Sequence, residues 1–334
     1  AAGLAPGAGG MRHSRTRDAE AIHHHYDVSN EFYEMLLGPS MTYTCACYPN
    51  EDATLEEAQF HKYDLVAKKL DLKPGMRLLD VGCGWGGMVR HAAKHYGVKV
   101  LGVTLSAEQA EWAQQEIKRQ GLEDLAEVRF SDYRDVIEGD FDAVSSIGLT
   151  EHIGVGQYPA YFEFLRSKLR PGGRLLNHCI TRPDNIHEAR VKGGFIDRYI
   201  FPDGELTGAG GIIVALQNAG LEMRHEENLR EHYARTVLLG ATTWWRTGTR
   251  RSPRSARPRP RSGACTWPGP AWASTSADRT APGAGRAAGR AGSFALPAAP
   301  HLRSLIHRRP VRSVTTYGPA AGCSGAVRMT RRPE

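Results

Sequence analysis

The chain of 334 residues has no run of about 18 or more apolar residues, which excludes an ordinary membrane-spanning helix. Its first ten residues lack a basic segment followed by an apolar core, so a secretory signal peptide is not expected. The six cysteines are scattered, and the Cys45 and Cys47 pair has no second pair at zinc-ligand spacing. We therefore expect a globular, cytoplasmic protein with reduced thiols and no metal site.

Acidic residues and lysine are nearly absent from the end of the chain. Residues 246–334 contain 17 arginines, no lysine and two acids, and they hold 11 of the 19 prolines. Residues 1–245 carry 26 Lys and Arg against 34 Asp and Glu, so the formal net charge of +7 originates in the tail. This composition predicts a disordered, low-complexity segment at 239–334. An Arg-rich nucleic-acid-binding protein is an alternative, although no recognisable module supports it, and no specific nucleic acid is expected.

From residue 76 the chain alternates short apolar strands with amphipathic helices. Strands are expected at 77–81, 98–103, 126–130, 141–147 and 174–180. Helices are expected at 88–96, 106–120 and 157–169, a turn at 171–173, and a regular pattern returns at 212–219 and 221–227. This alternation predicts an α/β fold with a doubly wound, mostly parallel sheet.

The residues before the first strand predict an N-terminal helical cap. One amphipathic helix is expected at about 20–37 and a second at 54–70, opened by a capping box at Thr54–Glu57. We divide the chain into a disordered leader (1–18), the cap (19–75), the α/β domain (76–238) and the tail (239–334). The His23–His25 run does not predict a metal site, because consecutive helical residues point about 100° apart.

A glycine-rich loop follows the first strand. Gly82 and Gly84 let the backbone turn tightly and approach a ligand, and Gly87 would let helix and strand touch. A dinucleotide site would need an acid at the end of the second strand, but residues 102–106 contain none. The acid, Asp80, precedes the glycines instead. This arrangement favours S-adenosylmethionine over a dinucleotide or a loop that serves packing alone.

Other polar positions near this loop have competing interpretations. Gln109 completes a capping-box pattern with Ser106, so it serves either its own helix or the cofactor. Asp132 and Tyr133 follow the third strand, where adenine could be stacked and hydrogen-bonded. An exposed turn acid is the alternative for Asp132.

Eight further strings lie in order along residues 20–238. They are H-Y-D-V-S-N (25–30), M-T-Y-T-C-A (41–46), G-V-T-L-S (102–106), S-D-Y-R-D (131–135), S-I-G-L-T-E-H (146–152), N-H-C-I-T (177–181), Y-I-F-P (199–202) and H-Y-A-R-T (232–236). With the glycine loop they resemble the cyclopropane-fatty-acyl-phospholipid synthases and the mycolic acid cyclopropane synthases. The resemblance implies a class I (Rossmann-like) methyltransferase fold. It also implies S-adenosylmethionine-dependent methylene transfer to the cis double bond of a phospholipid acyl chain.

The resemblance assigns residues to two groups of contacts. The cofactor would be contacted by Tyr43, Thr44, Gly82, Cys83, Gly84, Gly86, Thr104, Leu105, Gln109, Asp132 and Tyr133, to which the loop pattern adds Asp80. A bicarbonate ion, the base of the reaction, would be held around Cys45, Ile147, Glu151, His178 and Tyr233.

Structural interpretations compete with these catalytic ones. Glu151 is also placed as an acid favoured by the dipole of a helix N-terminus. His178 lies within an apolar strand, where a buried, hydrogen-bonded histidine is the ordinary interpretation, and Cys45 fits as a small buried apolar residue. The chemistry itself needs a dry cavity, because methyl transfer to an alkene leaves a carbocation that water would quench.

Two related reactions stay open. The same residues would serve transfer without ring closure, which gives a methylene or methyl branch, and a small-molecule N- or O-methyltransferase is a further alternative. Extracting an acyl chain from a bilayer costs ~0.8 kcal/mol per methylene, so we expect peripheral contact with the inner face of the cell membrane. Residues 182–211 and the helix near 32–37 are the candidate mouth. The oligomeric state is left open.

The tail departs abruptly from the family pattern. After residues 232–236 the family continues with amphipathic helices that close the acyl pocket, whereas this sequence changes to Arg, Pro, Gly, Ala and Ser. A GC-rich gene read one base out of frame gives that composition. We hypothesise a frameshift near 237–245, which the nucleotide sequence tests, with a genuine Arg-rich extension as the alternative. A frameshift would leave the acyl pocket without its lid.

Overall fold

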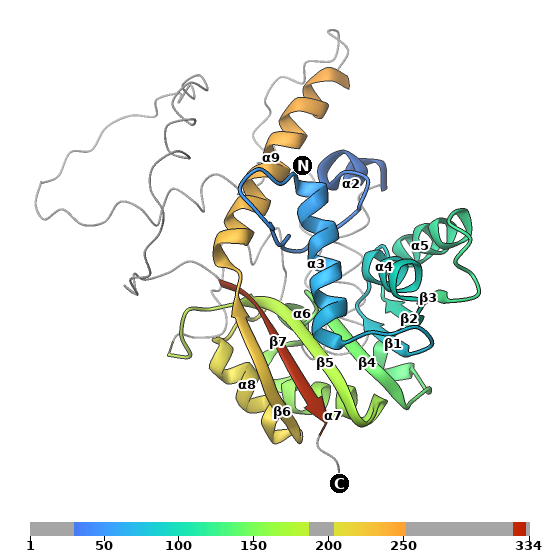
Figure 1. The fold of residues 1–334 in the computed structure, drawn as a ribbon. Helices are drawn as coiled ribbons and strands as arrows, with labels where there is room; N and C mark the ends of the chain where they lie inside the picture. The colour runs from blue at the N-terminus through green and yellow to red at the C-terminus, as the bar shows by residue number, and fades with distance from the viewer. Residues whose placement is uncertain (1–29, 187–203, 252–322, 332–334) are drawn as a thin grey trace, which may run out of the picture.

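A seven-stranded sheet organises the part of the chain that the structure, a computed structural model, describes: residues 30–186, 204–251 and 323–331 (Figure 1). The strand order is β3-β2-β1-β4-β5-β7-β6. The strands are β1 (Arg77–Val81), β2 (Lys99–Thr104), β3 (Ala126–Phe130), β4 (Phe141–Ile147), β5 (Leu169–Thr181), β6 (Leu221–Asn228) and β7 (Cys323–Arg331). Strand β7 is antiparallel to both β5 and β6, and the other pairings are parallel. The predicted doubly wound, mostly parallel sheet is confirmed.

Helices cover both faces of this sheet. They are α2 (Asn30–Leu37), α3 (Leu55–Leu70), α4 (Gly87–Tyr96), α5 (Ala107–Arg119), α6 (Thr150–Ile153), α7 (Tyr158–Lys168), α8 (Ala209–Asn218) and α9 (Arg230–Arg251), with short 3₁₀ turns at Tyr133–Asp135 and Val155–Gln157. Neighbouring residues of β1 point to opposite faces. Leu78 belongs to the core cluster that includes residues of α3 and α4, and Leu79 belongs to the cluster on the other face that includes residues of α7. Both leucines are fully buried, as expected for a parallel strand that is covered on both sides.

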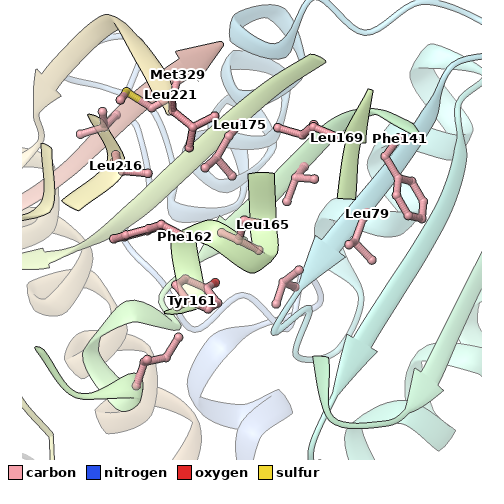
Figure 2. Close-up of a cluster of buried hydrophobic side chains, with 14 of the residues drawn as sticks. Leu79, Phe141, Tyr161, Phe162, Leu165, Leu169, Leu175, Leu216, Leu221 and Met329 are labelled. Carbon is pink, nitrogen blue, oxygen red and sulfur yellow. The ribbon is translucent and has the colours of Figure 1, made fainter. Parts of the chain in front are cut away.

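The core between the sheet and α7 is rich in large side chains. Figure 2 shows Tyr161, Phe162 and Leu165 of α7 beneath the strands, with Leu175 of β5 among them. These four side chains are at most 1% exposed. Met329 of β7 extends the same cluster toward β6 and α8. The core therefore continues into a strand supplied by the last residues of the chain.

The cap helix α3 begins as the sequence predicts. The Thr54 hydroxyl accepts from the Glu57 amide at 3.2 Å, and the Glu57 carboxylate accepts from the Thr54 amide at 2.8 Å, which completes the capping box. Helix α2 begins at Asn30 in the described residues. The leader, the first part of the predicted helix at 20–37 and the histidines at 23–25 lie outside them.

The expectation of a disordered tail from residue 239 is wrong for two described segments. Helix α9 continues to Arg251, and residues 323–331 form β7. The reason for β7 is local alternation, with Val327 and Met329 buried in the core while Arg328 and Thr330 are less buried. The average composition of a long segment does not reveal an alternation of buried and exposed residues that extends over only a few positions. Residues 252–322 and 332–334 lie outside what the structure describes. The frameshift near 237–245 stays a hypothesis for the nucleotide sequence to test.

A second correction concerns the turn predicted at 171–173. These residues lie inside β5, which runs from Leu169 to Thr181. The pairing register with β4 shifts between Phe141 and Ala143, so the extra residues form an irregularity in the strand. Of the candidate mouth, residues 187–203 lie outside the described part. In the described ranges, no helix combines the length and apolarity that crossing a membrane requires.

The contribution of β7 to stability can be measured by comparing two methionines that are paired in the register of β6 and β7. Met329 of β7 is fully buried, and its register partner Met223 of β6 is 41% exposed. We expect Met329→Ala to lower the free energy of unfolding by about 2–5 kcal/mol, because it opens a cavity in the core. We expect Met223→Ala to cost less than about 1 kcal/mol. Urea unfolding of the full chain measures both, and equal costs would contradict the placement of β7.

Candidate functional site

The carboxyl ends of β1, β4 and β5 meet at one edge of the sheet, where ligands of such folds bind. The register pairs Asp80 with Ser145, and Ile147 with His178. A cavity that is partly open to solvent lies at this edge. Its lining includes most of the predicted site residues: Tyr43, Thr44, Cys45, Asp80, Gly82, Cys83, Gly84, Gln109, Ile147, Glu151, His178 and Tyr233. Segments that lie up to 190 residues apart in the chain therefore form one site.

The glycine loop turns sharply where it borders the cavity. Gly82, Gly84 and Gly86 have φ angles of +71°, +54° and +70°, which other residues rarely adopt. The Gly82 and Cys83 amides both donate to the Val103 carbonyl at 3.0 Å and tie the loop to β2. A Cβ at Gly84 would have no atom within 4 Å. The loop backbone is therefore open to a ligand at Gly84.

Gly87 has a different role from the predicted helix–strand contact. A Cβ at Gly87 would lie 2.2 Å from the Tyr63 hydroxyl of α3, so this glycine admits the cap helix. The close helix–strand approach occurs instead at Gly102, where a Cβ would lie 2.7 Å from Val89 of α4. The loop therefore brings the cap and the sheet together.

Asp80 is a buried carboxylate behind the loop. It is 2% exposed and accepts a hydrogen bond of 2.6 Å from the Ser145 hydroxyl. Burial raises its pKa to about 6, against the opposing effects of Ser145 and the Lys62 ammonium. At neutral pH the cavity therefore holds a poorly solvated negative charge beside the glycine loop.

The polar side chain of Gln109 faces the cavity. The backbone amide of Gln109 donates to the Ser106 hydroxyl at 3.3 Å. The side-chain oxygen of Gln109 accepts a hydrogen bond from the Thr104 hydroxyl at 2.9 Å. Half of the expected capping box is thus present, and the amide group remains available at the cavity wall. Thr104 contacts Gln109 and does not itself line the cavity. Leu105 follows β2 and does not line the cavity either.

Asp132, Tyr133 and Gly86 also lie outside the cavity lining. Asp132 caps the turn at Tyr133–Asp135 and forms an ion pair of 2.6 Å with Arg134, and Tyr133 packs edge-on against Tyr161. Asp132 is therefore not the exposed turn acid of the alternative interpretation. The adenine contact of this pair stays a prediction. Gly86 caps α4 in the left-handed conformation.

Glu151 is fixed at one oxygen only. Helix α6 holds its side chain 6% exposed, and its Oε1 accepts from the Ile180 amide at 2.7 Å. Within the described residues its buried Oε2 has no hydrogen-bond partner. Burial raises the Glu151 pKa to about 7, although the Ile180 hydrogen bond opposes the shift. A buried acceptor of this kind is costly unless a ligand satisfies it.

His178, Cys45 and Tyr233 complete this end of the cavity. Burial lowers the His178 pKa to about 3, with Lys62 and Lys69 adding to the shift, so its imidazole is neutral at physiological pH. Cys45 is 1% exposed and packs in one cluster with Tyr233. Burial also raises the pKa of the Tyr233 phenol.

The first turns of α9 hold the cap segment that carries Cys45. The Thr236 hydroxyl accepts from the Ala46 amide at 3.0 Å, and His232 Nδ1 accepts from the Tyr48 amide at 3.0 Å. Arg235 donates to the Asn50, Glu51 and Ala53 carbonyls. The H-Y-A-R-T string therefore both supplies Tyr233 and anchors the opposite wall.

No individual role was predicted for eight lining residues: Met41, Thr42, Tyr63, Trp85, Met88, Gly148, His152 and Ile180. Six of them lie in the glycine loop or in the family strings, and Tyr63 and Met88 lie outside both. Lys62 and Gln59 of α3, whose side chains donate hydrogen bonds to Thr42 and Thr44, were also not predicted. A signal existed for Lys62. It interrupts the series Ala58, Val66, Leu70 at a spacing of four residues, so a cation occupies the buried stripe of α3.

Comparison with known proteins identifies the family. The model of the mycolic acid cyclopropane synthetase family matches residues 13–247. The chain belongs to this family. Its fold is the class I methyltransferase fold, as predicted.

Relatives and solved structures agree with this assignment. The "Probable fatty acid methyltransferase Rv3720" of Mycobacterium tuberculosis is 68% identical over 69% of this chain, which spans only 53% of that relative's length. The cyclopropane synthase MmaA2 of M. tuberculosis superposes with a TM-score of 0.65 at 34% identity, covering 70% of this chain and 85% of that one. The synthase CmaA1, solved with SAH and CTAB, gives a TM-score of 0.63 at 34% identity and the same coverage.

The buried Asp80 gives a prediction about stability and cofactor binding. Its pKa is raised from 3.8 to about 6, so its ionisation weakens the ligand-free fold as pH rises through that window. Asp80→Asn should raise the free energy of unfolding at pH 7 by up to about 3 kcal/mol. It should also weaken S-adenosylhomocysteine binding, measured by calorimetry. Asp142→Asn is the control. It should lower the free energy of unfolding at pH 7, because the hydrogen-bond partners of Asp142 lower its pKa. A destabilised Asp80→Asn would contradict this account.

Proposed function

We propose that this protein transfers a methylene unit from S-adenosylmethionine to the cis double bond of an unsaturated acyl chain in a phospholipid, forming a cyclopropane ring. The single observation that carries the proposal is the Glu151 carboxylate. One of its oxygens is fixed by the sheet, and the other is buried without a hydrogen-bond partner in the described residues, within the cavity that the glycine loop borders.

The residues present fit S-adenosylmethionine. The open backbone at Gly84 allows close approach, and the Gln109 amide and the Tyr43 and Thr44 side chains surround the same space. The Asp80 carboxylate offers negative charge to a cationic ligand. When bound, the cofactor supplies an electrophilic methyl group on a sulfonium, whose C–S bond breaks as the alkene carbon takes the methyl.

The residues around Glu151 also fit a bicarbonate ion that serves as the base. At a pH above about 7, ionised Glu151 accepts a hydrogen bond from the O–H of such an ion and orients it. The neutral His178 ring offers a further polar contact, while Ile147 and Cys45 exclude water from that end. The proton that must leave the new methyl group would pass to this ion, and the C–C bond then closes the ring.

The chain's own contribution is positioning and water exclusion. Holding the alkene in line with the sulfonium contributes ~7–11 kcal/mol to such reactions. A dry cavity prevents water from capturing the cation before the proton leaves. The relative named as a probable fatty acid methyltransferase favours a second outcome, in which the proton leaves a neighbouring chain carbon and a methyl-branched alkene results. A saturated methyl branch would need a hydride donor in addition.

Access to the substrate requires contact with a lipid surface. We propose peripheral docking at the cavity mouth, near α2. Several basic surface residues are already paired with acids: Lys68 with Asp64, Lys69 with Glu227, and Arg170 with Asp142. These charges are therefore weak candidates for attraction to anionic lipid.

The product distinguishes the proposed reactions. In a bacterial host that makes monounsaturated phospholipids, expression of the full chain should add the mass of one CH₂ to the acyl chains and remove the alkene signal. A retained alkene with the same mass gain would indicate methylene transfer without ring closure. A parallel culture should carry the gene with one base restored near codon 240. No lipid gain in either culture would contradict both outcomes.

Glu151→Gln should lower turnover by ~10²–10⁴-fold, because an amide cannot hold the base in the same way. It should also abolish the rise in turnover that we expect as pH increases through about 7. The measurement is turnover against pH on mixed vesicles of unsaturated phospholipid. Glu205→Gln is the matched control, since its carboxylate caps the Val155 amide beside α6 outside the cavity lining. Equal losses in both variants would show that Glu151 only supports the fold.

A further inference from the structure

Lys62 places a cation inside the protein beside the cofactor cavity. Its side chain lies on the buried stripe of α3 and the residue is 2% exposed. Its ammonium donates to the Thr44 hydroxyl at 2.8 Å and stands 4.5 Å from the centroid of the Tyr63 ring. Among the described residues it forms no ion pair with a carboxylate. The carboxylate that favours its charged form, Asp80, is hydrogen-bonded to Ser145.

A neutral hydroxyl is a poor partner for a buried ammonium. Desolvating a charge costs several kcal/mol unless an opposite charge or several hydrogen bonds compensate. A methionine would fill the same stripe of α3 without that cost. The position therefore makes sense if an anion enters the neighbouring space when the site is loaded.

Thr44 is the group through which this charge reaches the cavity. Its oxygen accepts from Lys62, so its own proton is directed away from the ammonium. The Gln59 side chain donates to the Thr44 carbonyl at 3.0 Å and fixes the backbone. A Cβ at Gly148 would lie 2.7 Å from the Thr44 methyl group, which confines that side of the residue. Thr44 lines the cavity beside Gly82 and Gly84.

We propose that Lys62 is a positioning residue that orients the Thr44 hydroxyl and supplies positive charge for a carboxylate, the one carried by the amino-acid part of S-adenosylmethionine. The inference rests on the cofactor assignment proposed for this cavity. A second anion, bicarbonate, shares the carboxylate chemistry and is separated by the experiment below.

The charge of Lys62 also predicts a pH dependence. Burial lowers its pKa to about 8, and the facing groups are Cys45 and Cys47 of the cap, Asp80 of β1 and His178 of β5, with Lys69 and Tyr63 on its own helix. Asp80 titrates at about 6, His178 at about 3 and Cys47 at about 11, all outside the window around pH 8. Carboxylate binding favours the ammonium, so affinity should fall as pH rises above about 8.

The test compares two ligands that differ in the amino-acid part. S-adenosylhomocysteine carries the carboxylate and 5′-methylthioadenosine lacks it. With the full chain at pH 7, we expect Lys62→Met and Thr44→Val to weaken S-adenosylhomocysteine binding roughly 10- to 100-fold in calorimetry, the range for a hydrogen bond to a charged group. Binding of 5′-methylthioadenosine should change less than about twofold. Thr44→Ser should restore most of the affinity.

Coupling between the two residues separates positioning from simple support of the fold. If Lys62 acts through Thr44, the double variant loses little more than either single variant. The fall in affinity above pH 8 should be present in the wild type and absent in Lys62→Met. Equal weakening of both ligands would overturn the proposal and assign Lys62 to the fold.

The bicarbonate arm uses the fluorescence of Trp85, which lines the same cavity. Loss of a bicarbonate-dependent change in Lys62→Met, with S-adenosylhomocysteine affinity intact, would assign the charge to bicarbonate and overturn the carboxylate assignment. Neither measurement requires lipid turnover. A failure of the lipid reaction and a failure of the Lys62 proposal therefore give different results.

Discussion

The parallel pairing of β1 with β4, and of β4 with β5, is the constraint on which the site depends. This pairing sets Asp80 beside Ser145 and Ile147 beside His178 without any contribution from a ligand. Because all these strands end at one edge, the glycine loop after β1 and α6 after β4 start from neighbouring points. The cap then only has to cover that edge. It does so through α3, which reaches the loop at Gly87, and through the segment held by α9.

The buried ionisable groups at this edge oppose the stability of the ligand-free fold. Burial raises the pKa of Asp80 and Glu151 and lowers the pKa of Lys62 and His178, so burial disfavours the charged form of each group. Such groups persist where function requires them, and a zwitterionic, sulfonium-bearing ligand is the kind of molecule that compensates several of them at once. The charged groups that a ligand would contact are thus in place before it binds, and they lower the stability of the ligand-free protein.

Much of the sheet could be predicted from the sequence, because largely apolar segments next to glycines mark β1 and β4, and strands alternate with helices along the chain. The strings around the loop and at 41–46, 146–152 and 177–181 also indicated most of the cavity wall. The spacing of four residues in α3 marks Lys62 as buried, but its contact with Thr44 depends on how α3 packs and is shown by no local motif. The position of Asp132 depended on its pairing with Arg134, a choice of side-chain geometry that spacing does not reveal. The strand at 323–331 was hidden because its two buried residues lie in an arginine-rich composition.

The place of β7 in the sheet has a consequence for the order in which the protein can assemble. In the described sheet β6 hydrogen-bonds to β7 alone, and β7 is the last described element of the chain. On the ribosome, β6 and α8 therefore emerge well before the strand that joins them to β5. Until that strand arrives, the outer edge of β5 stays exposed, which is a state in which aggregation and chaperone binding compete with folding. Completion of the part of the sheet that carries the candidate site, β3-β2-β1-β4-β5, does not have to wait for it.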